Sequence, residues 1–273
     1  MNISLFSSRI SCAIALGTSF KQKLRLLFYM ALKPSLVFRG LATFFNSRIL
    51  AFSIFGARRA PIDVYVLDNG VGAMTIAEYF SPHSAIMPAN LPALHPKVIY
   101  DLGANVGVSS LFFSSLYPQA TIYGFEPLPE NFELCCLNYR GIPNPSQVFP
   151  WAIGSKSGTA TFDCKNDSRG GRLKSTHPDP NLQTIAQIQV KIVSIADLIG
   201  KEGLPPPDFL KIDVEGAEYD VLEGLNSYAH LVSSIYLETH GERLKHDCLL
   251  WLGNHNFQTC QGLDPTAIWA WRA

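Results

Sequence analysis

The sequence predicts an α/β fold in which helices cover both faces of a mostly parallel sheet. From residue 98 onward, short apolar strands alternate with helical segments, which is typical of parallel strands joined by helical crossovers. Two of these strands break into turns rich in glycine or acidic residues, at 103–107 and 213–218. Hydrophobic residues make up 47% of the 273 residues and charged residues only 16%, which excludes a disordered chain.

The expected strands are Val98–Leu102, Thr121–Phe125, Gln147–Ala152, Phe209–Ile212 and Leu231–Glu238. The expected helices are Val106–Leu116, Pro129–Asn138, Ala217–Leu225 and Gly241–Gly253. A strand at Val64–Leu67 and a short helix at Met74–Phe80 precede them. Two more strands, Thr159–Phe162 and Ile188–Ile192, flank the polar loop Asn166–Pro180, which we interpret as a mobile surface excursion or a substrate lid.

The first sixty residues form a separate compositional zone, with nine basic residues and no acidic one. We expect two helices there, Phe20–Leu32 and a second from Pro34 to about Phe55, as an extension (1–60) of the domain formed by 61–273. An interfacial helix pair on an anionic membrane, a packed helical cap and a targeting segment all stay open. No helix that spans a membrane is expected, because polar residues interrupt the apolar runs.

Bulk charge and cysteine usage restrict the partners and the location. The remainder of the chain holds all 22 acidic residues and is therefore acidic, so no nucleic-acid partner is expected. The six cysteines lack the spacing of a zinc site, and Cys135 and Cys136 are neighbours that a disulfide would strain. We expect reduced thiols and a cytoplasmic protein, with peripheral membrane contact through residues 1–60 left open.

The turn after the first strand of the series predicts a ligand site. The run Asp101–Gly107 (DLGANVG) leads from a buried strand into a helix, and glycine is needed where a ligand lies across such a turn. The spacing differs from the dinucleotide fingerprint, in which Asn105 and Val108 would be glycines. We expect Asp101 to hold the ammonium group of a methionyl-adenosine ligand.

The end of the second strand adds a carboxylate to this site. Glu126, followed by Pro127, stands where an acid accepts both ribose hydroxyls of a nucleoside lying across the sheet. The alternative is that Glu126 only favours the N-terminus of the next helix. Trp151 and Ala152 end the third strand, where they would flank the adenine, although Trp151 is equally suited to the core.

Two later strands end in groups that can carry chemistry. Asp213 and Glu215 follow one strand, Glu238 and His240 end the next, and Lys211 precedes Asp213. If these strands are neighbours, Asp213 and Glu238 converge beside Asp101. They would serve with His240 as a general base for a hydroxyl nucleophile, or hold Mg²⁺ that lowers the hydroxyl pKa. Alternatively, Glu215 and Glu218 only favour a helix N-terminus and Lys211 only pairs with one of the acids.

Four blocks in order, Asp101–Gly107 (DLGANVG), Phe125–Asn131 (FEPLPEN), Leu210–Glu218 (LKIDVEGAE) and Glu238–His240 (ETH), resemble the FkbM family of S-adenosylmethionine-dependent methyltransferases. The resemblance covers about residues 61–262. It implies a Rossmann-like class I methyltransferase sheet of seven strands with a final antiparallel strand, for which His255–Cys260 and Ala267–Trp271 would supply the last two.

The resemblance also implies O-methylation of a hydroxyl on a sugar, glycan or secondary metabolite. Carried over onto this sequence, the cofactor contacts would be Asp101, Gly103, Ala104, Asn105, Gly107 and Glu126. Asp213 would lie beside the point of methyl transfer.

Two other functions are alternatives to methyl transfer. A nicotinamide-dependent oxidoreductase would use a related sheet, but the missing fingerprint glycines count against it. A membrane-associated nucleoside-binding protein without catalysis would keep the fold and work through its basic N-terminal zone, but the expected convergence of acids at one sheet edge counts against it.

Overall fold

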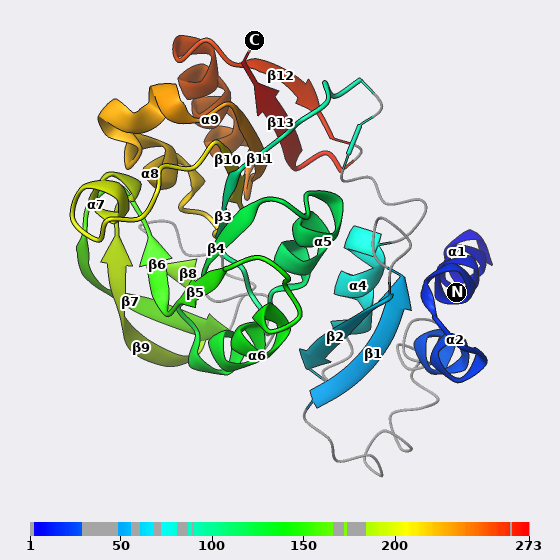
Figure 1. The fold of residues 1–273 in the computed structure, drawn as a ribbon. Coiled ribbons are helices and arrows are strands. Elements are labelled where there is room, and N and C mark those ends of the chain that lie inside the picture. The colour runs from blue at the N-terminus through cyan, green and yellow to red at the C-terminus, as the bar shows by residue number, and fades with distance from the viewer. Residues whose placement is uncertain are drawn as a thin grey trace.

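The computed structural model describes residues 3–28, 49–55, 61–67, 72–80, 87–88, 90–165, 172–173, 184–262 and 264–272. Its centre is a seven-stranded sheet in the order β12-β13-β11-β10-β3-β4-β5 (Figure 1). The strands are β3 (Val98–Leu102), β4 (Thr121–Phe125), β5 (Gln147–Phe149), β10 (Phe209–Ile212), β11 (Ser234–Glu238), β12 (Gln258–Gln261) and β13 (Ala267–Trp271). β13 runs antiparallel to both of its neighbours, and the other neighbouring pairs are parallel. The expected α/β sheet is confirmed.

Helices cover both faces of this sheet because its strands are apolar on both sides. In β3 and β10, Ile99 and Phe209 join one hydrophobic cluster, and Tyr100 and Leu210 join the other. Successive side chains of a strand point to opposite faces, so a strand buried on both sides is apolar on both, and the buried Asp101 and Lys211 are exceptions that pair with each other. The helices of the first face are α5 (Val108–Leu116) and α6 (Pro129–Tyr139). Those of the second are α7 (Ile195–Gly200), α8 (Glu218–Glu223), the 3₁₀ helix η3 (Asn226–Leu231) and α9 (Glu242–Asn254).

A second, four-stranded sheet lies beside the first, in the order β6-β9-β7-β8. Its strands are β6 (Trp151–Ile153), β9 (Thr184–Val193), β7 (Gly158–Lys165) and β8 (Arg172–Leu173). The predicted single strand Gln147–Ala152 is wrong, since β5 belongs to the central sheet and β6 to the second. Pro150 separates the two strands, and proline has no N–H to give to a ladder. The two other predicted strands lie within β7 and β9.

Two predicted boundaries differ for local reasons. The helix predicted from Val106 begins at Val108, because Gly107 takes a left-handed backbone conformation (φ 84°) directly before it. The strand predicted from Leu231 begins at Ser234, because residues up to Leu231 belong to η3. The predicted lid Asn166–Pro180 lies outside the described residues, except for β8 within it.

The N-terminal region contains α1 (Ile3–Leu16), α2 (Phe20–Leu27), β1 (Ile49–Phe55), β2 (Pro61–Leu67) and α4 (Gly72–Phe80). The predicted helix to about Phe55 is wrong over β1, which pairs antiparallel with β2. Residues such as Ile49 and Phe52 favour strands once a partner strand is present. The earlier part of that helix falls in 29–48, outside the described residues. Pairing of β1 with β2 crosses residue 60, and a domain boundary there stays a prediction.

Two further observations concern the N-terminal zone and the thiols. Ala13 of α1 and Leu26 of α2 are completely buried in the cluster that contains Val64 and Ile76.

Among the helices that the structure describes, none has the length and apolar character needed to cross a membrane. The cysteines with described side chains, Cys12, Cys135, Cys136, Cys248 and Cys260, are free thiols.

Candidate active site

A pocket of about 560 Å³, open to solvent, lies at the carboxyl ends of β3, β4 and β10. This edge is where open α/β sheets bind ligands. Its lining includes the following predicted residues: Gly103, Asn105, Glu126, Pro127, Trp151, Ala152, Asp213 and Glu215. It also includes residues that were not predicted as site residues, among them Asn131 and Val214, which lie within the quoted sequence blocks, and Phe162.

The turn after β3 is built so closely against the end of β10 that only glycine fits. Gly103 has φ +76°, and a Cβ there would lie 1.8 Å from the carbonyl oxygen of Asp213. The backbone N–H groups of Gly103 and Ala104 both donate to the carbonyl oxygen of Phe125 at 3.0 Å. The turn is therefore held between β4 and β10, and its backbone faces the pocket.

Glu126 is placed by backbone hydrogen bonds at the floor of the pocket. Its carboxylate accepts N–H bonds from Asn105 and Leu128, both at 2.9 Å, and the residue is 5% exposed. Burial raises the pKa of Glu126 to about 7, although these N–H groups lower it. The side chain of Asn131 also donates to this carboxylate, and an acceptor position is left for a hydroxyl group of a ligand.

Aromatic rings and the second sheet form another wall. Trp151 stacks on Phe149 with ring centroids 4.6 Å apart, and Phe149 stacks on Phe125 at 5.5 Å. The ammonium of Lys191 lies 3.8 Å from the centroid of the Trp151 ring. Phe162 of β7 reaches the same pocket, a contribution that depends on the folding of the second sheet and that no motif signals.

Asp101 lies inside the protein and does not line the pocket. It is fully buried, and its Oδ2 accepts hydrogen bonds from the hydroxyls of Ser109 (2.6 Å) and Ser110 (2.5 Å). Its Oδ1 lies 3.3 Å from the ammonium of Lys211. Ala104 and Gly107 likewise stand outside the lining. The predicted contact of Asp101 with a ligand ammonium stays a prediction.

Lys211 contacts both the turn after β3 and the acidic residue that follows β10. Its ammonium donates to the carbonyl oxygen of Gly103 at 2.8 Å and lies 3.5 Å from Oδ2 of Asp213. The side chain is 2% exposed. Burial lowers the pKa of Lys211, but the charges of Asp101 and Asp213 outweigh burial and raise it above its usual value. Lys211 is therefore a permanent cation that positions its neighbours.

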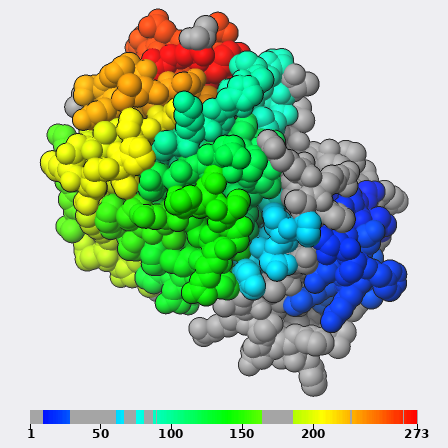
Figure 2. All heavy atoms as spheres, in the orientation of Figure 1, coloured from blue at the N-terminus to red at the C-terminus, as the bar shows by residue number. Residues whose placement is uncertain are grey.

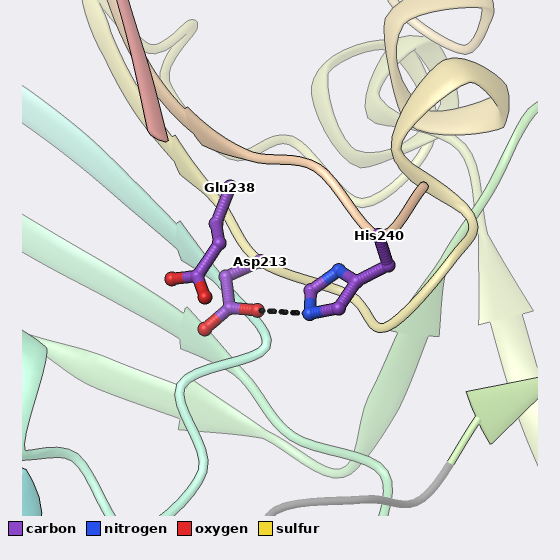
Figure 3. Close-up of side chains that lie close together, drawn as sticks. All are labelled: Asp213, Glu238 and His240. Carbon is purple, nitrogen blue, oxygen red and sulfur yellow. Dashed lines mark ion pairs between the residues drawn. The ribbon is translucent and has the colours of Figure 1, made fainter. Parts of the chain in front are cut away.

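Asp213, Glu238 and His240 come together at one point (Figure 3). β10 and β11 are parallel neighbours with Ile212 opposite Leu237, so the next residues of both strands emerge side by side. One ligand atom from each of the three side chains lies within 4.8 Å of the others. The predicted adjacency of these two strands is confirmed.

His240 is held by a buried acid that the sequence interpretation treated as a helix-end residue. Oε1 of Glu218, which is fully buried, lies 2.9 Å from Nδ1 of His240 and accepts the N–H of Gly216 at the same distance. Nε2 of His240 lies 3.9 Å from Oδ1 of Asp213 and 3.7 Å from Oε2 of Glu215. Glu218 is thus a functional candidate that only the tertiary contact with His240 reveals.

Protonation of the cluster follows from this crowding of acids. Burial lowers the pKa of His240, but the hydrogen bond to Glu218 and the charges of Glu215, Glu218 and Asp213 outweigh it and raise the pKa to about 9. Burial and the charges of Asp213 and Glu78 raise the pKa of Glu238 to about 8. At neutral pH His240 therefore carries a proton on both nitrogens and accepts none, which makes it a poor general base in this state.

Comparison with known proteins identifies the family of the chain. Residues 101–259 match the family described as "Methyltransferase FkbM domain". Hexuronic acid methyltransferase AglP of Haloferax volcanii is 27% identical over 52% of this chain and 56% of its own length. The 2-O-methyltransferase NoeI of Sinorhizobium fredii is 28% identical over 54% of this chain and 65% of its own length.

A solved structure, Aeropyrum pernix fibrillarin in complex with S-adenosyl-L-methionine, is also similar. It is 13% identical, covers 81% of this chain and 93% of its own, and superposes with a TM-score of 0.42. The chain spans less than two thirds of the length of the two curated relatives above.

Proposed function

Because the chain belongs to the methyltransferase FkbM domain family, we propose that it is an S-adenosylmethionine-dependent O-methyltransferase. Its acceptor would be a hydroxyl group of a sugar, glycan or secondary metabolite. Two relatives support this acceptor class by their names, a hexuronic acid methyltransferase and a 2-O-methyltransferase. The observation that carries the proposal is the pocket between the Gly103 turn, Glu126 and Asp213.

The pocket residues fit the proposed cofactor. Glu126 would accept the ribose hydroxyls, and Trp151, whose ring faces are covered by Phe149 and Lys191, would border the adenine with its ring edge. The backbone of Gly103, which lines the pocket, would contact the methionyl part. When bound, S-adenosylmethionine supplies an electrophilic methyl group on a sulfonium.

The acidic end of the pocket would handle the acceptor. Asp213 lines the pocket, is partly exposed, and faces Lys211 on one side and His240 on the other. We assign it the role of the base that takes the proton of the acceptor hydroxyl as the new bond forms. Protonated His240 and Lys211 would orient the Asp213 carboxylate by their charge. Holding the reacting oxygen in line and excluding water would supply much of the rate.

Titration calorimetry with S-adenosylmethionine, S-adenosylhomocysteine and NAD tests the cofactor assignment. We expect the first two to bind in the micromolar range and NAD not to bind. The Glu126→Ala variant should lose most of this affinity, because Glu126 lines the pocket. Asp101→Ala should also lose it, but through the turn, since it leaves Lys211 without its buried partner. A folded protein that binds neither sulfonium ligand nor its product would refute the proposal.

A divalent cation, Mg²⁺ first, held by Asp213, Glu238 and a deprotonated His240, is the alternative to a protonated His240 at this site. Oδ1 of Asp213 and Nε2 of His240 lie 3.9 Å apart, so the two side chains would move closer by about 1 Å to act as adjacent ligands of one octahedral ion at about 2.1 Å each. The bond of Nδ1 to Glu218 leaves Nε2 for an ion, as in many metal sites. Binding would displace the protons that these groups hold at neutral pH, and the ion would make the acceptor hydroxyl more acidic.

Electron paramagnetic resonance with Mn²⁺ as the probe tests the metal site independently of activity. Saturable loss of the free Mn²⁺ signal is expected for the wild type and for the surface control Glu223→Gln. It should be weakened in Glu238→Gln. Absence of saturable binding to the wild type would refute the metal site and leave the methyl-transfer proposal intact.

Location and partners complete the proposal. We propose a cytoplasmic protein that acts on a small-molecule or glycan acceptor and not on nucleic acid, since residues 61–273 are acidic overall. Peripheral contact with a membrane through residues 1–60 belongs to the same proposal.

A further inference from the structure

Helices α1 and α2 bury one side and expose another that is apolar. Ala13 and Leu26 are fully buried in the core. On the outside, Phe20 is 81% exposed, Leu24 57% and Ile14 53%. Figure 2 shows this segment, in blue, at the outer surface of the molecule. We call Phe20 and Leu24, which lie on one face of α2, the apolar patch.

The order of residues around α2 places positive charge on both sides of this patch. At about 100° per residue, Phe20 and Leu24 are separated by about 40° around the helix, and Leu26 points away from them into the core. Lys23 falls on one flank of the exposed apolar face. Lys21 falls on the other flank. The helix therefore shows an apolar strip between two basic edges.

The composition around the strip selects an anionic partner. Residues 1–60 contain nine basic residues and no acidic one, so no acid within this zone offsets the charge. Free phosphate and nucleic acid would attract the basic residues, but neither would cover the exposed apolar side chain of Phe20. An anionic lipid surface meets both features, because it offers phosphate groups and an acyl layer directly beneath them.

We propose that α2 docks in the plane of an anionic lipid surface. Phe20 and Leu24 enter the boundary between headgroups and acyl chains, and Lys21 and Lys23 lie among the headgroup phosphates. Its eight residues extend about 12 Å, which suits contact with one surface. This inference goes beyond the proposed methyl transfer and does not depend on it.

Flotation of the full-length protein with vesicles tests the proposal. The probes are vesicles of phosphatidylcholine alone and of phosphatidylcholine mixed with phosphatidylglycerol. We expect the wild type to float with the mixed vesicles only. Phe20→Ser/Leu24→Ser should abolish flotation. Lys21→Gln/Lys23→Gln/Arg25→Gln should lower the partition coefficient at least about 25-fold, because Lys21 and Lys23 near the surface each contribute about a fivefold factor.

Two matched variants control for general loss of apolar or basic surface. Leu249→Ser/Leu250→Ser removes exposed apolar side chains from α9. Lys156→Gln/Lys201→Gln/Arg243→Gln removes the same number of charges from exposed positions elsewhere. Both should float as the wild type does, and thermal melting should show that every variant is folded.

Three results would overturn the inference. One is a wild type that fails to float with the mixed vesicles or floats equally with neutral ones. Another is a folded Phe20→Ser/Leu24→Ser variant that floats as well as the wild type. The third is sedimentation without lipid that shows a dimer which this variant dissociates, since a second copy of the chain would then be the occupant of the patch.

Discussion

Replacement of Lys211 by methionine is the most informative single change, because it removes a buried cation from between two acids. Asp101 is fully buried and Lys211 is 2% exposed, with 3.3 Å between the ammonium and Oδ1 of Asp101. Removing one partner of such a pair leaves an uncompensated buried charge, which costs about 3–5 kcal/mol. Oδ2 keeps its bonds to Ser109 and Ser110, so we expect a loss near the lower end of this range.

Urea unfolding followed by tryptophan fluorescence measures this loss. The free energy of unfolding of Lys211→Met should fall by about 3 kcal/mol. The double variant Asp101→Asn/Lys211→Met should recover most of it, because the buried carboxylate is then removed as well. Exposed Lys201, which pairs with Asp197 on the surface, serves as the control, and Lys201→Met should leave the unfolding midpoint unchanged.

The reasoning fails if Lys211→Met unfolds at the wild-type urea concentration, or if the double variant is no more stable than the single one. In either case Asp101 would not depend on the Lys211 charge, and Lys211 would have no claim to a positioning role. The same variant should bind S-adenosylmethionine weakly, because the ammonium also holds the carbonyl oxygen of Gly103.

Three other outcomes are expected. Gly103→Ala should lower the free energy of unfolding by about 3 kcal/mol or more, and Gly203→Ala by about 1 kcal/mol. Both glycines have positive φ, but only a Cβ at Gly103 would meet a backbone atom. Equal losses in urea unfolding would contradict the close packing at Gly103. Because the pKa of Glu126 is raised, the folded protein binds an extra proton between about pH 4.5 and 7, and the free energy of unfolding falls as pH rises through this window. Glu126→Gln should reduce that fall by up to about 3 kcal/mol. An unchanged dependence of the unfolding free energy on pH would refute the raised pKa of Glu126. Asp213→Asn should leave binding of S-adenosylmethionine largely intact in calorimetry and reduce kcat of methyl transfer at least about a hundredfold, and a variant with full turnover would exclude Asp213 as the base.

The central fold could be predicted from the sequence because its signals are local. Apolar strands such as Val98–Leu102 and Phe209–Ile212 are buried on both faces, and the periodicity of the segments between them is helical. Gly103 and Glu126 could be assigned to a pocket for the same reason, since parallel strands bring their carboxyl ends to one edge.

The misassigned segments depended on partners elsewhere in the chain. Ile49–Phe55 reads as part of a helix until β2 offers it a ladder of hydrogen bonds, and tertiary pairing then decides its conformation. The second sheet is a similar case, because β6 leaves the central sheet at Pro150 to pair with β9, more than thirty residues further along the chain.

By itself the sequence determined the parallel α/β architecture, the glycine turn and the acids that follow β10 and β11, because strand order and residue type are written locally. Only the tertiary structure decided what those acids do. It buried Asp101 against Lys211, opened Asp213 to the pocket, and placed Glu218 against His240 so that the ring holds its proton near neutral pH. Charge state depends on burial and on neighbours brought from distant segments, and a sequence pattern does not contain either quantity.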